Sequence, residues 1–368
     1  MATAARPHID DPRPQIILDG REREELRIGL LALSIVETVA GLYRCEATFG
    51  NYGAVRGGTD FLYFDRKTFE FGKAFRVSLP GGALFDGRIT ALEARFPAAS
   101  PPTLVVLAED RFQDLRMTRR TRAFADITDA DVFGRIAEQY GLGTDVRLTG
   151  GPHKLLAQVN QSDLAFLRER ARALGAELWI ETAPDGRAVL KACGRSDRPG
   201  GAPVKLGWRN ELQAFTVLAD LSGQRTSVAA TGWDPGAKAG LRHEATDGEI
   251  RGELGGDDSG ASILRARFGE RKESLAHAVP LDAPEARARA TSYFQLNARR
   301  FVVGRGVART EPRLRVGTWV DLDGLGPLFS GRYYLAEVHH CFDGVRALRT
   351  ELVAERPGLG RASREGSS

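Results

Sequence analysis

The stretch Val159–Ile180 reads VNQSDLAFLRERARALGAELWI and decides the local fold of the middle of the chain. Ser162 is a good helix N-cap, and Asp163 adds negative charge to the first turn, where the helix dipole favours it. Apolar residues then recur at three- and four-residue steps, which predicts one apolar helix face: Leu164, Phe166, Leu167, Ala171 and Leu174. Gly175 should end the helix, because glycine adopts a positive φ at little cost. A buried strand over 178–180 should follow.

A second helix is predicted just upstream of this stretch. Apolar residues between Phe124 and Tyr140 follow helical spacing, with Thr128 or Asp129 as the cap and Gly141 as the stop. A helix packed on a small sheet explains this region without any catalytic role. We therefore expect a small α/β domain over residues 122–200.

Short apolar segments separated by glycine and proline turns flank this domain. The chain has 42 Gly and 17 Pro in 368 residues, which favours many short strands over long helices. Residues 15–121 contain at least five such segments, including a predicted strand over 26–39, as in an antiparallel barrel or sandwich. Strand patterns return in 201–235 and 280–357, interrupted by a predicted helix over 284–300.

The remaining segments are rich in glycine, proline or charge. We expect a flexible arm over 1–14, a loop-rich insertion over 236–279 and a disordered tail over 358–368. Residues 236–260 should be the most mobile internal segment, because their glycines and acidic side chains leave little to bury.

Composition does not indicate a nucleic-acid partner. There are 52 basic and 48 acidic residues, giving a net charge of +4, and only seven of the basic residues are lysines. A basic footprint must be clustered to bind nucleic acid. The arginines between Asp110 and Arg122 could form a phosphate-binding patch or a connector paired with nearby carboxylates, and we favour the connector.

The cysteine pattern favours a reducing compartment, and the apolar runs do not indicate a signal peptide or a membrane helix. Cys45, Cys193 and Cys341 are odd in number and far apart, with no CxxC pair, so we expect three buried free thiols. The N-terminus lacks the apolar core of a signal peptide, and no apolar run approaches the roughly 20 residues of a membrane helix. We expect assembly in the cytoplasm.

Few residues suggest catalysis or metal binding. His339, His340 and Cys341 form the one local cluster of potential ligands, but adjacent strand residues point to opposite faces, so the two histidines should not share an ion. We expect no metal and no cofactor. The chain also lacks GxSxG, HExxH and Walker motifs, which favours a protein that is not an enzyme.

Several stretches resemble one family. QSDLAFLRERARALGA, at 161–176, closely resembles the Q-x-x-S-D-x-x-F-L-x-R-x-A-x-x-x-G-x signature of phage late-control gene D proteins, which are baseplate hub proteins of contractile tails. VgrG spike proteins and the hubs of extracellular contractile injection systems share this signature. Further stretches resemble the family in the same order: LFDGRI at 84–89, RRTR at 119–122, GWDP at 232–235, GTWV at 317–320, and FSGRY with HCFD at 329–333 and 340–343. The matching structural positions are Phe85, Gly87, Ser162, Asp163, Phe166, Leu167, Gly175, Trp233, Asp234, Gly317, Gly331, Tyr333 and His340.

The resemblance implies a fold that is mainly β with α+β elements: two antiparallel β-barrel domains, side by side, joined by the small α/β domain. It also implies a homotrimeric ring of six barrels that adapts a hexameric inner tube to a trimeric spike. The expected partners are further copies of this chain, the inner tube protein, a separate spike protein and baseplate wedge proteins. Nucleic acid is not an expected partner, nor is a membrane in the resting particle. The chain would then be a component of a phage virion or phage tail-like particle. Tyr333 and His340 are expected to be buried structural residues.

A trimer would match both the six-fold tube and the three-fold spike if the two strand-rich regions that flank the α/β domain are similar barrels. Each region contains an x-F-x-G segment, at 84–87 and at 328–331, that we expect to be a strand. Two alternatives come from other classes: a tail-associated peptidoglycan hydrolase, which needs paired carboxylates or zinc in a cleft, and an arginine-rich nucleic-acid-binding protein, whose affinity would fall steeply with salt.

Overall fold

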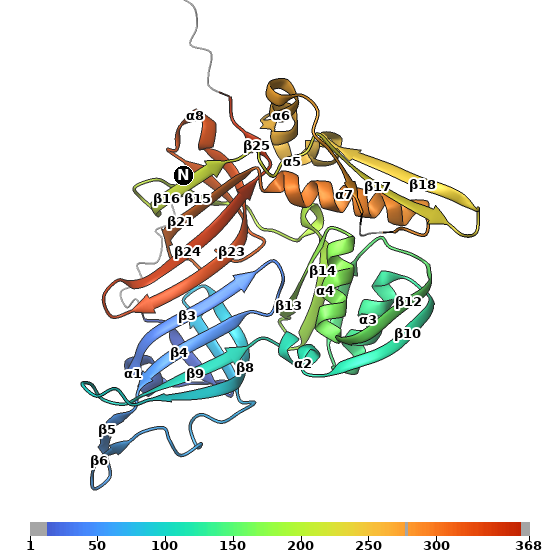
Figure 1. Cartoon of the computed structure of the whole chain (residues 1–368). Helices are drawn as coiled ribbons and strands as arrows, with labels where there is room; N and C mark the ends of the chain where they lie inside the picture. The colour runs from blue at the N-terminus through green and yellow to red at the C-terminus, as the bar shows by residue number, and fades with distance from the viewer. Residues whose placement is uncertain (1–12, 277–278, 362–368) are drawn as a thin grey trace, which may run out of the picture.

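The computed structural model describes residues 13–276 and 279–361, and Figure 1 shows its arrangement. The fold is mainly β, with two antiparallel barrels at one side of the molecule and two smaller α/β units at the other. The predicted fold class of two barrels and a small α/β domain is confirmed. The expected arm over 1–14 and the expected tail over 358–368 lie largely outside the described residues.

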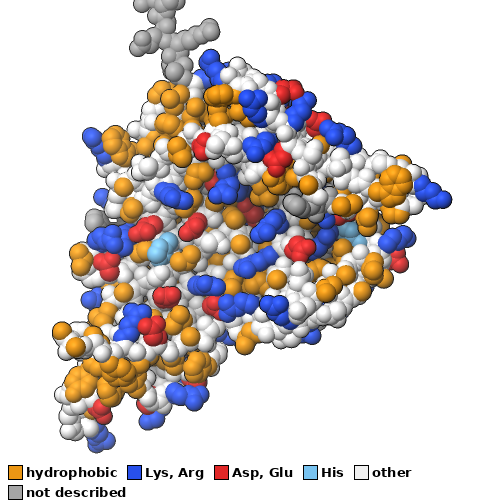
Figure 2. Space-filling view, viewed as in Figure 1, with side chains coloured by type: hydrophobic (Ala, Val, Ile, Leu, Met, Phe, Trp, Pro, Cys, Tyr) orange, Lys and Arg blue, Asp and Glu red, His pale blue; other side chains and the backbone are white. Residues whose placement is uncertain are grey.

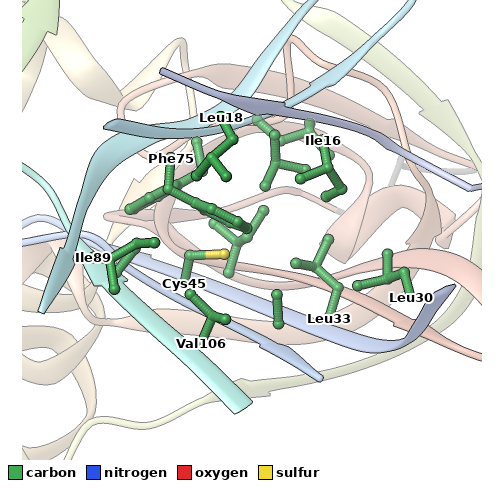
Figure 3. Close-up of a cluster of buried hydrophobic side chains, with 14 of the residues drawn as sticks. Ile16, Leu18, Leu30, Leu33, Cys45, Phe75, Ile89 and Val106 are labelled. Carbon is green, nitrogen blue, oxygen red and sulfur yellow. The ribbon is translucent and has the colours of Figure 1, made fainter. Parts of the chain in front are cut away.

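The first barrel is an antiparallel sheet in the strand order β2-β1-β7-β8-β9-β4-β3. Its elements are β1 (Gln15–Leu18), β2 (Arg21–Glu22), α1 (Glu24–Gly29), β3 (Leu30–Thr38), β4 (Arg44–Gly50), β7 (Ala74–Leu79), β8 (Gly82–Arg95) and β9 (Thr103–Glu109). Alternate residues of these strands point inward, as the two-residue period of a strand requires. Figure 3 shows the resulting core, in which Ile16 and Leu18 face Leu33, Cys45 and Val106 across the barrel.

The predicted strand over 26–39 is wrong in its first part. Glu24–Gly29 forms α1 instead, and the strand begins at Leu30. Glu24 and Glu25 stand in the first turn of that helix, where negative charge is favourable, and Arg27 pairs with Glu24 at 2.6 Å. Leu26, on this helix, is fully buried. A buried apolar residue at this position fits a strand as well as a helix, so the sequence pattern could not distinguish the two.

The second barrel has the strand order β16-β21-β24-β23-β22-β15. Its elements are β15 (Val204–Gly207), β16 (Leu212–Ala219), β21 (Val302–Arg309), β22 (Trp319–Asp323), α8 (Gly326–Phe329), β23 (Gly331–Asp343) and β24 (Ala347–Arg356). All neighbours are antiparallel except β15 and β22, which are parallel. The expected strand over 328–331 is wrong, because Leu328 and Phe329 belong to the short helix α8, which has Pro327 in its first turn, and β23 begins only at Gly331.

A continuous backbone ladder joins the two barrels. β3 of the first barrel pairs antiparallel with β23 of the second through seven residue pairs, from Ala32 with Asp343 to Thr38 with Glu337. We call this pairing the seam. It merges both barrels into one 13-stranded sheet, so neither barrel can turn against the other without breaking main-chain hydrogen bonds.

The middle domain contains the predicted helices. It comprises α2 (Phe112–Arg116), β10 (Arg119–Ile127), α3 (Asp129–Gln139), β11 (Gly143–Arg147), β12 (His153–Ser162), α4 (Asp163–Ala173), β13 (Ala176–Thr182), β14 (Ala188–Gly194) and the 3-10 turn η1 (Arg195–Asp197). Ser162 caps α4 by accepting a hydrogen bond from Ala165 N at 3.2 Å, and Thr128 caps α3. Gly175 follows α4 with a φ of 65°, as expected of a helix stop. The expected connector over 110–122 is more ordered than predicted, because it includes α2 and the start of β10.

Residues 236–276 differ from the expected loop-rich insertion. With neighbouring segments they form a fourth unit of β17 (Ser227–Asp234), β18 (Ala239–Thr246), η2 (Asp247–Ile250), α5 (Arg251–Leu254), β19 (Asp258–Ser259), α6 (Gly260–Phe268), β20 (Lys272–Leu275) and α7 (Ala283–Arg299). The expectation was wrong because a few apolar residues are enough to form a small core in this unit. Ala245, Ile250 and Ala261 pack against Ala290 and Phe294 of α7. The predicted helix over 284–300 corresponds to α7 and is confirmed.

Two neighbouring segments also belong to this unit. β17 pairs with β18 and β20, so residues 227–234 lie outside the second barrel. The prediction from the sequence that they belong to that barrel is wrong. β25 (Gly358–Leu359) pairs with β19, so the expected disordered tail is ordered at its first two residues.

Asp110 fixes the joint between the first barrel and the middle domain. Its buried carboxylate accepts hydrogen bonds from the backbone N–H groups of Tyr43 and Phe112, each at 2.9 Å. Burial nevertheless dominates and raises the pKa of Asp110 to about 7.

Stability should therefore depend on the protonation of Asp110. The folded chain keeps a proton there that the unfolded chain releases near its ordinary pKa of 3.8, so the stabilisation is complete below pH 3.8 and is lost as pH rises through about 7. Compared with Asp110→Asn, which does not titrate, the wild-type free energy of unfolding should fall by about 2–3 kcal/mol from pH 5 to pH 8. Urea denaturation of both proteins at both pH values measures this. If the difference in free energy of unfolding between wild type and Asp110→Asn did not change with pH, the predicted role of Asp110 would be refuted.

Candidate functional site

The Ser-Asp pair of the helix α4 signature has a structural role that the sequence shows only in part. Ser162 is the N-cap, and Asp163 is fully buried beside it. Four side chains donate hydrogen bonds to the Asp163 carboxylate: Arg120 Nε at 3.1 Å, Arg122 Nη2 at 2.6 Å, Tyr140 Oη at 2.7 Å and Gln158 Nε2 at 2.8 Å. Phe166 and Leu167 of the same helix are buried in the core of the middle domain. The signature thus ties α4 to β10 and β12.

The arginines between residues 110 and 122 are bound within the chain. Arg111 pairs with Asp114 at 2.8 Å, and Arg116 pairs with Glu109 at 2.5 Å. Arg119 donates to the backbone oxygen of Asn160, while Arg120 and Arg122 share Asp163. This arrangement fits a connector with internal partners, the interpretation favoured from the sequence, better than a phosphate-binding patch.

Glu177 is the centre of a buried ionic junction between the middle domain and the second barrel. Its carboxylate, on β13, accepts from Arg195 Nε at 3.2 Å and from Arg198 Nη1 at 2.8 Å. It also accepts from the hydroxyl of Tyr334 on β23. Burial raises the pKa of Tyr334 well above its ordinary value, and the negative charge of Glu177 adds to the shift, so the hydroxyl stays protonated as a donor.

The two arginines extend the junction in both directions. Arg195 reaches Glu355 on β24 at 3.0 Å, and its guanidinium lies 4.0 Å from the ring centre of Tyr334. Arg198 lies 4.0 Å from the ring centre of Trp179 and donates to the backbone oxygen of Val316 at 2.8 Å. Each charge therefore has an opposite partner, which offsets the cost of burying it.

Glu37, a buried carboxylate at the end of the seam, forms a second ion pair with a partly exposed arginine. This β3 carboxylate is 1% exposed, pairs with Arg315 and accepts from Val316 N at 3.1 Å. Arg315 also donates to the backbone oxygen of Ala83 on β8 at 2.9 Å. The first barrel thus receives both a charge and a backbone contact from the segment that precedes β22.

Two of the signature glycines make room for neighbouring groups. A Cβ on Gly317, whose φ is 92°, would lie 2.0 Å from Arg198 Nε, and a Cβ on Gly87 would lie 2.3 Å from the backbone oxygen of Glu109. Gly331 likewise has a positive φ, of 136°, and adjoins Arg356.

The other signature residues serve the core or turns, with one exception. Phe85 and Tyr333 are buried in the first and second barrels, and Asp234 closes a turn by accepting from the backbone of residues 236 and 237. Trp233 is 53% exposed and has no such role in the core.

His339 and His340 point to opposite faces of β23, as the sequence argument required. His340 is fully buried, and its Nδ1 lies 2.9 Å from Thr350 Oγ1, while its Nε2 has no hydrogen-bond partner among the described residues. Burial lowers the pKa of His340 to about 3, with the charge of Arg315 contributing, so the ring is neutral at pH 7. His339 instead lies on the outer face of the seam, beside Cys341 and Glu351. The sequence missed Glu351 because only the register of β24 brings it opposite His339.

The three cysteines are free and buried, as predicted. Among the described residues, no helix combines the length and apolar character needed to cross a bilayer.

A cavity of about 640 Å³ opens between the first barrel, the middle domain and the segment before β22. Of its carboxylates, Glu37 pairs with Arg315, Asp86 with Arg76 at 3.4 Å, and Glu181 with Lys191 at 2.9 Å. The fourth, Asp110, is held by two backbone N–H groups. These partners leave the cavity without a pair of available carboxylates in the described structure, which disfavours acid–base hydrolysis there.

An exposed group of aromatic rings stands at the far end of the first barrel. The strands β5 (Tyr52–Val55) and β6 (Gly58–Phe61) form a separate two-stranded hairpin. Four rings cluster on the hairpin and on the segments that follow β6 and β8, and we call them the aromatic hairpin patch: Tyr52, Phe61, Phe64 and Phe96. Figure 2 shows hydrophobic side chains gathered at the lower left of the molecule, where β5 and β6 lie in Figure 1.

This patch is unusual for a surface of an isolated chain. Phe61 touches the other three rings, with centroid distances between 5.0 and 6.2 Å, yet all four side chains are between 37% and 64% exposed. A contiguous exposed apolar patch marks an interaction site more often than a lone exposed residue does. An isolated hairpin is also only marginally stable in water, so a partner would stabilise it.

Solved structures of phage tail proteins share this fold. The 43 kDa tail protein of prophage MuSo2 from Shewanella oneidensis is 15% identical, with a TM-score of 0.65 over 94% of this chain and 98% of its own. A tail protein from Neisseria meningitidis MC58 is 13% identical, with a TM-score of 0.66 over 95% and 97% of the two chains.

A third solved structure comes from a secretion system. An Escherichia coli component of the type VI secretion system, described as similar to the T4 bacteriophage tail proteins gp27 and gp5, is 13% identical. It aligns with a TM-score of 0.56 over 90% of this chain and 76% of its own. At these identities the likeness establishes the fold alone.

Sequence comparisons add one family. The model described as the Alg8 N-terminal domain matches residues 72–343, which is most of the chain. No curated protein matches the sequence.

Loss of the junction carboxylate should be costly. Glu177→Gln would leave two buried guanidinium groups without their shared counter-charge, so the free energy of unfolding should fall by about 3–5 kcal/mol. Urea denaturation at pH 7 measures this effect. Glu93→Gln is the matched control, because Glu93 forms an exposed pair with Arg95 at 2.6 Å and its loss should change little. Equal, small effects of the two substitutions would contradict a structural role for the junction.

Proposed function

The chain belongs to the family described as the Alg8 N-terminal domain, and from its fold we propose that it is a baseplate hub protein of a contractile phage tail-like particle. Three copies form a ring that adapts the hexameric inner tube to a trimeric spike. The particle is a phage tail or an extracellular contractile injection system. The observation that carries the proposal is the seam, which fixes two barrels side by side in one chain.

The strand arrangement supports two comparable units for the tube. The first barrel uses β1, β7, β8, β9, β4 and β3, and the second uses β15, β22, β23, β24, β21 and β16, so each has six principal strands. One chain thus offers two barrel units, and a ring of three offers six. Because the seam holds the units in one orientation, the ring can meet a six-fold tube on one side and keep a true three-fold axis for the spike.

Charge pairing inside the chain supports a structural role over the two alternatives. The carboxylates that line the large cavity are held by cations or backbone groups, which does not favour a peptidoglycan hydrolase. The arginines of the connector have partners within the chain, which does not favour a nucleic-acid-binding protein. The exposed aromatic hairpin patch is the more informative feature, because contiguous exposed apolar patches mark protein–protein contacts.

The stoichiometry of the assembled particle tests the proposal. The chain should be co-expressed with candidate tube and spike proteins, and the complex examined by native mass spectrometry. We expect three copies of this chain for each ring of the tube and for each spike trimer. One copy or six copies would contradict the adaptor function.

The aromatic hairpin patch should contribute to this assembly. The double variant Phe61→Ser, Phe96→Ser removes two exposed rings, so the thermal midpoint of the isolated chain should change little. Interface aromatic residues often contribute at least about 2 kcal/mol, which corresponds to roughly a 30-fold loss of affinity. Analytical ultracentrifugation of the mixture with its partners measures that loss.

Val345→Ser supplies the control, since Val345 is 94% exposed but stands alone at the β23–β24 turn. Assembly that survives the double variant as well as it survives the control would exclude the patch from the interface.

A further inference from the structure

Three side chains with metal-binding atoms converge on the outer face of the seam. The ligand atoms of His339, Cys341 and Glu351 all lie within 4.8 Å of one another. His339 Nδ1 and Glu351 Oε2 are 3.7 Å apart. Four-coordinate zinc has bonds of about 2.0–2.3 Å, which places its ligand atoms roughly 3–4 Å from each other. Small side-chain rotations would therefore suffice to surround one ion.

The strand register explains why these three residues meet. His339 and Cys341 are two positions apart on β23, so they share one face, and Glu351 on β24 lies directly opposite His339. His340, between them, points into the barrel and cannot take part. His339 and His340 therefore cannot share one ion, as the sequence indicated. The wider expectation of no metal was made without knowing that Glu351, on the paired strand, lies beside His339.

A hydrogen bond from the ring to Ser34 holds His339 in a fixed orientation, as is usual for histidine ligands of metals. Ser34 Oγ, on β3, lies 2.8 Å from His339 Nε2. With its proton on Nε2, the ring donates to Ser34 and leaves the lone pair of Nδ1 directed at Glu351. Hydrogen bonding of the second ring nitrogen to a fixed acceptor is the common arrangement around histidine ligands.

One cation stands next to the cluster, and its position leaves a ligand oxygen available. Arg349 Nε is 3.4 Å from Glu351 Oε1, and Arg349 Nη1 is 2.8 Å from Asp343 Oδ2. The guanidinium thus contacts Oε1, whereas Oε2 is the oxygen that faces His339. The site is also open to solvent on one side, since the side chains of His339 and Glu351 are 32% and 41% exposed.

We propose that His339, Cys341 and Glu351 form a binding site for a divalent, borderline-soft cation of the zinc class, with water as the fourth ligand. One nitrogen, one sulfur and one oxygen donor in a three-residue set suit Zn²⁺ better than Mg²⁺ or Ca²⁺, which prefer oxygen alone. Binding displaces the thiol proton, so the metal replaces a hydrogen at sulfur.

The bound ion would act as a cross-link at the place where the barrels join. It ties β23 to β24, and through the His339–Ser34 hydrogen bond it reaches β3, the strand that belongs to the first barrel. This role does not depend on the proposed function in a tail particle. Because the folded chain presents the three ligands together, binding should raise the midpoint of thermal unfolding.

Metal titration of the untagged, full-length chain tests the proposal. After removal of metal with a chelator, we expect one Zn²⁺ per chain, and Co²⁺ used as a probe should give a thiolate-to-cobalt absorption band. Cys341→Ser should abolish that band. His339→Ala and Glu351→Gln, which alter partly exposed side chains, should weaken Zn²⁺ binding without changing the thermal midpoint of the metal-free protein. Ser34→Ala should weaken it about 10- to 100-fold by releasing the ring.

Glu337→Gln is the matched control, because Glu337 is an exposed carboxylate on the same strand, two residues before His339. Its substitution should leave Zn²⁺ affinity unchanged. Absence of stoichiometric binding by the wild-type chain would overturn the proposal, as would binding that none of the three ligand variants reduces.

Discussion

The seam between β3 and β23 is the contact on which the rest of the structure depends. Seven residue pairs of backbone ladder cross from one barrel to the other, and Glu37 at the end of β3 is buried against Arg315 and Val316 N. A main-chain ladder has one register, so it sets distance, tilt and rotation together. Side-chain contacts alone would allow the barrels to slide or rock. The relative orientation of the two barrels therefore follows from backbone pairing.

The middle domain is fixed to this double barrel by charge rather than by apolar packing alone. Glu177 receives two arginines and the Tyr334 hydroxyl, and Gly317 leaves the space that Arg198 needs. Such a junction contributes little net free energy, because desolvation offsets most of the attraction. It does select one docked arrangement, since any other would leave buried charges without partners.

Local signals in the sequence predicted the parts of the fold that depend on local interactions. Ser162 and Gly175 mark the two ends of α4 in the structure, because N-caps and glycine stops depend only on residues a few positions away. The sequence did not reveal that Asp163 is a buried acceptor for Arg120 and Arg122, since those residues are about forty positions away. The seam was hidden because its two strands lie near opposite ends of the chain. The position of Glu351 opposite His339 was hidden because it depends on the register between β23 and β24. Residues 236–260 misled us because a few small apolar residues, among many glycines, were enough to pack on α7.

Amide hydrogen exchange tests the central claim, that the two barrels are one rigid body, most directly. Peptides covering residues 33–38 of β3 and 337–343 of β23 should exchange as slowly as the barrel cores, because the seam opens only when a barrel unfolds. The isolated wild-type chain suffices for this measurement. Slow exchange in both peptides, lost together as denaturant unfolds the barrels, is the result that we predict. Fast exchange at the seam while both barrel cores stay protected would show that the barrels move independently, and would contradict the account.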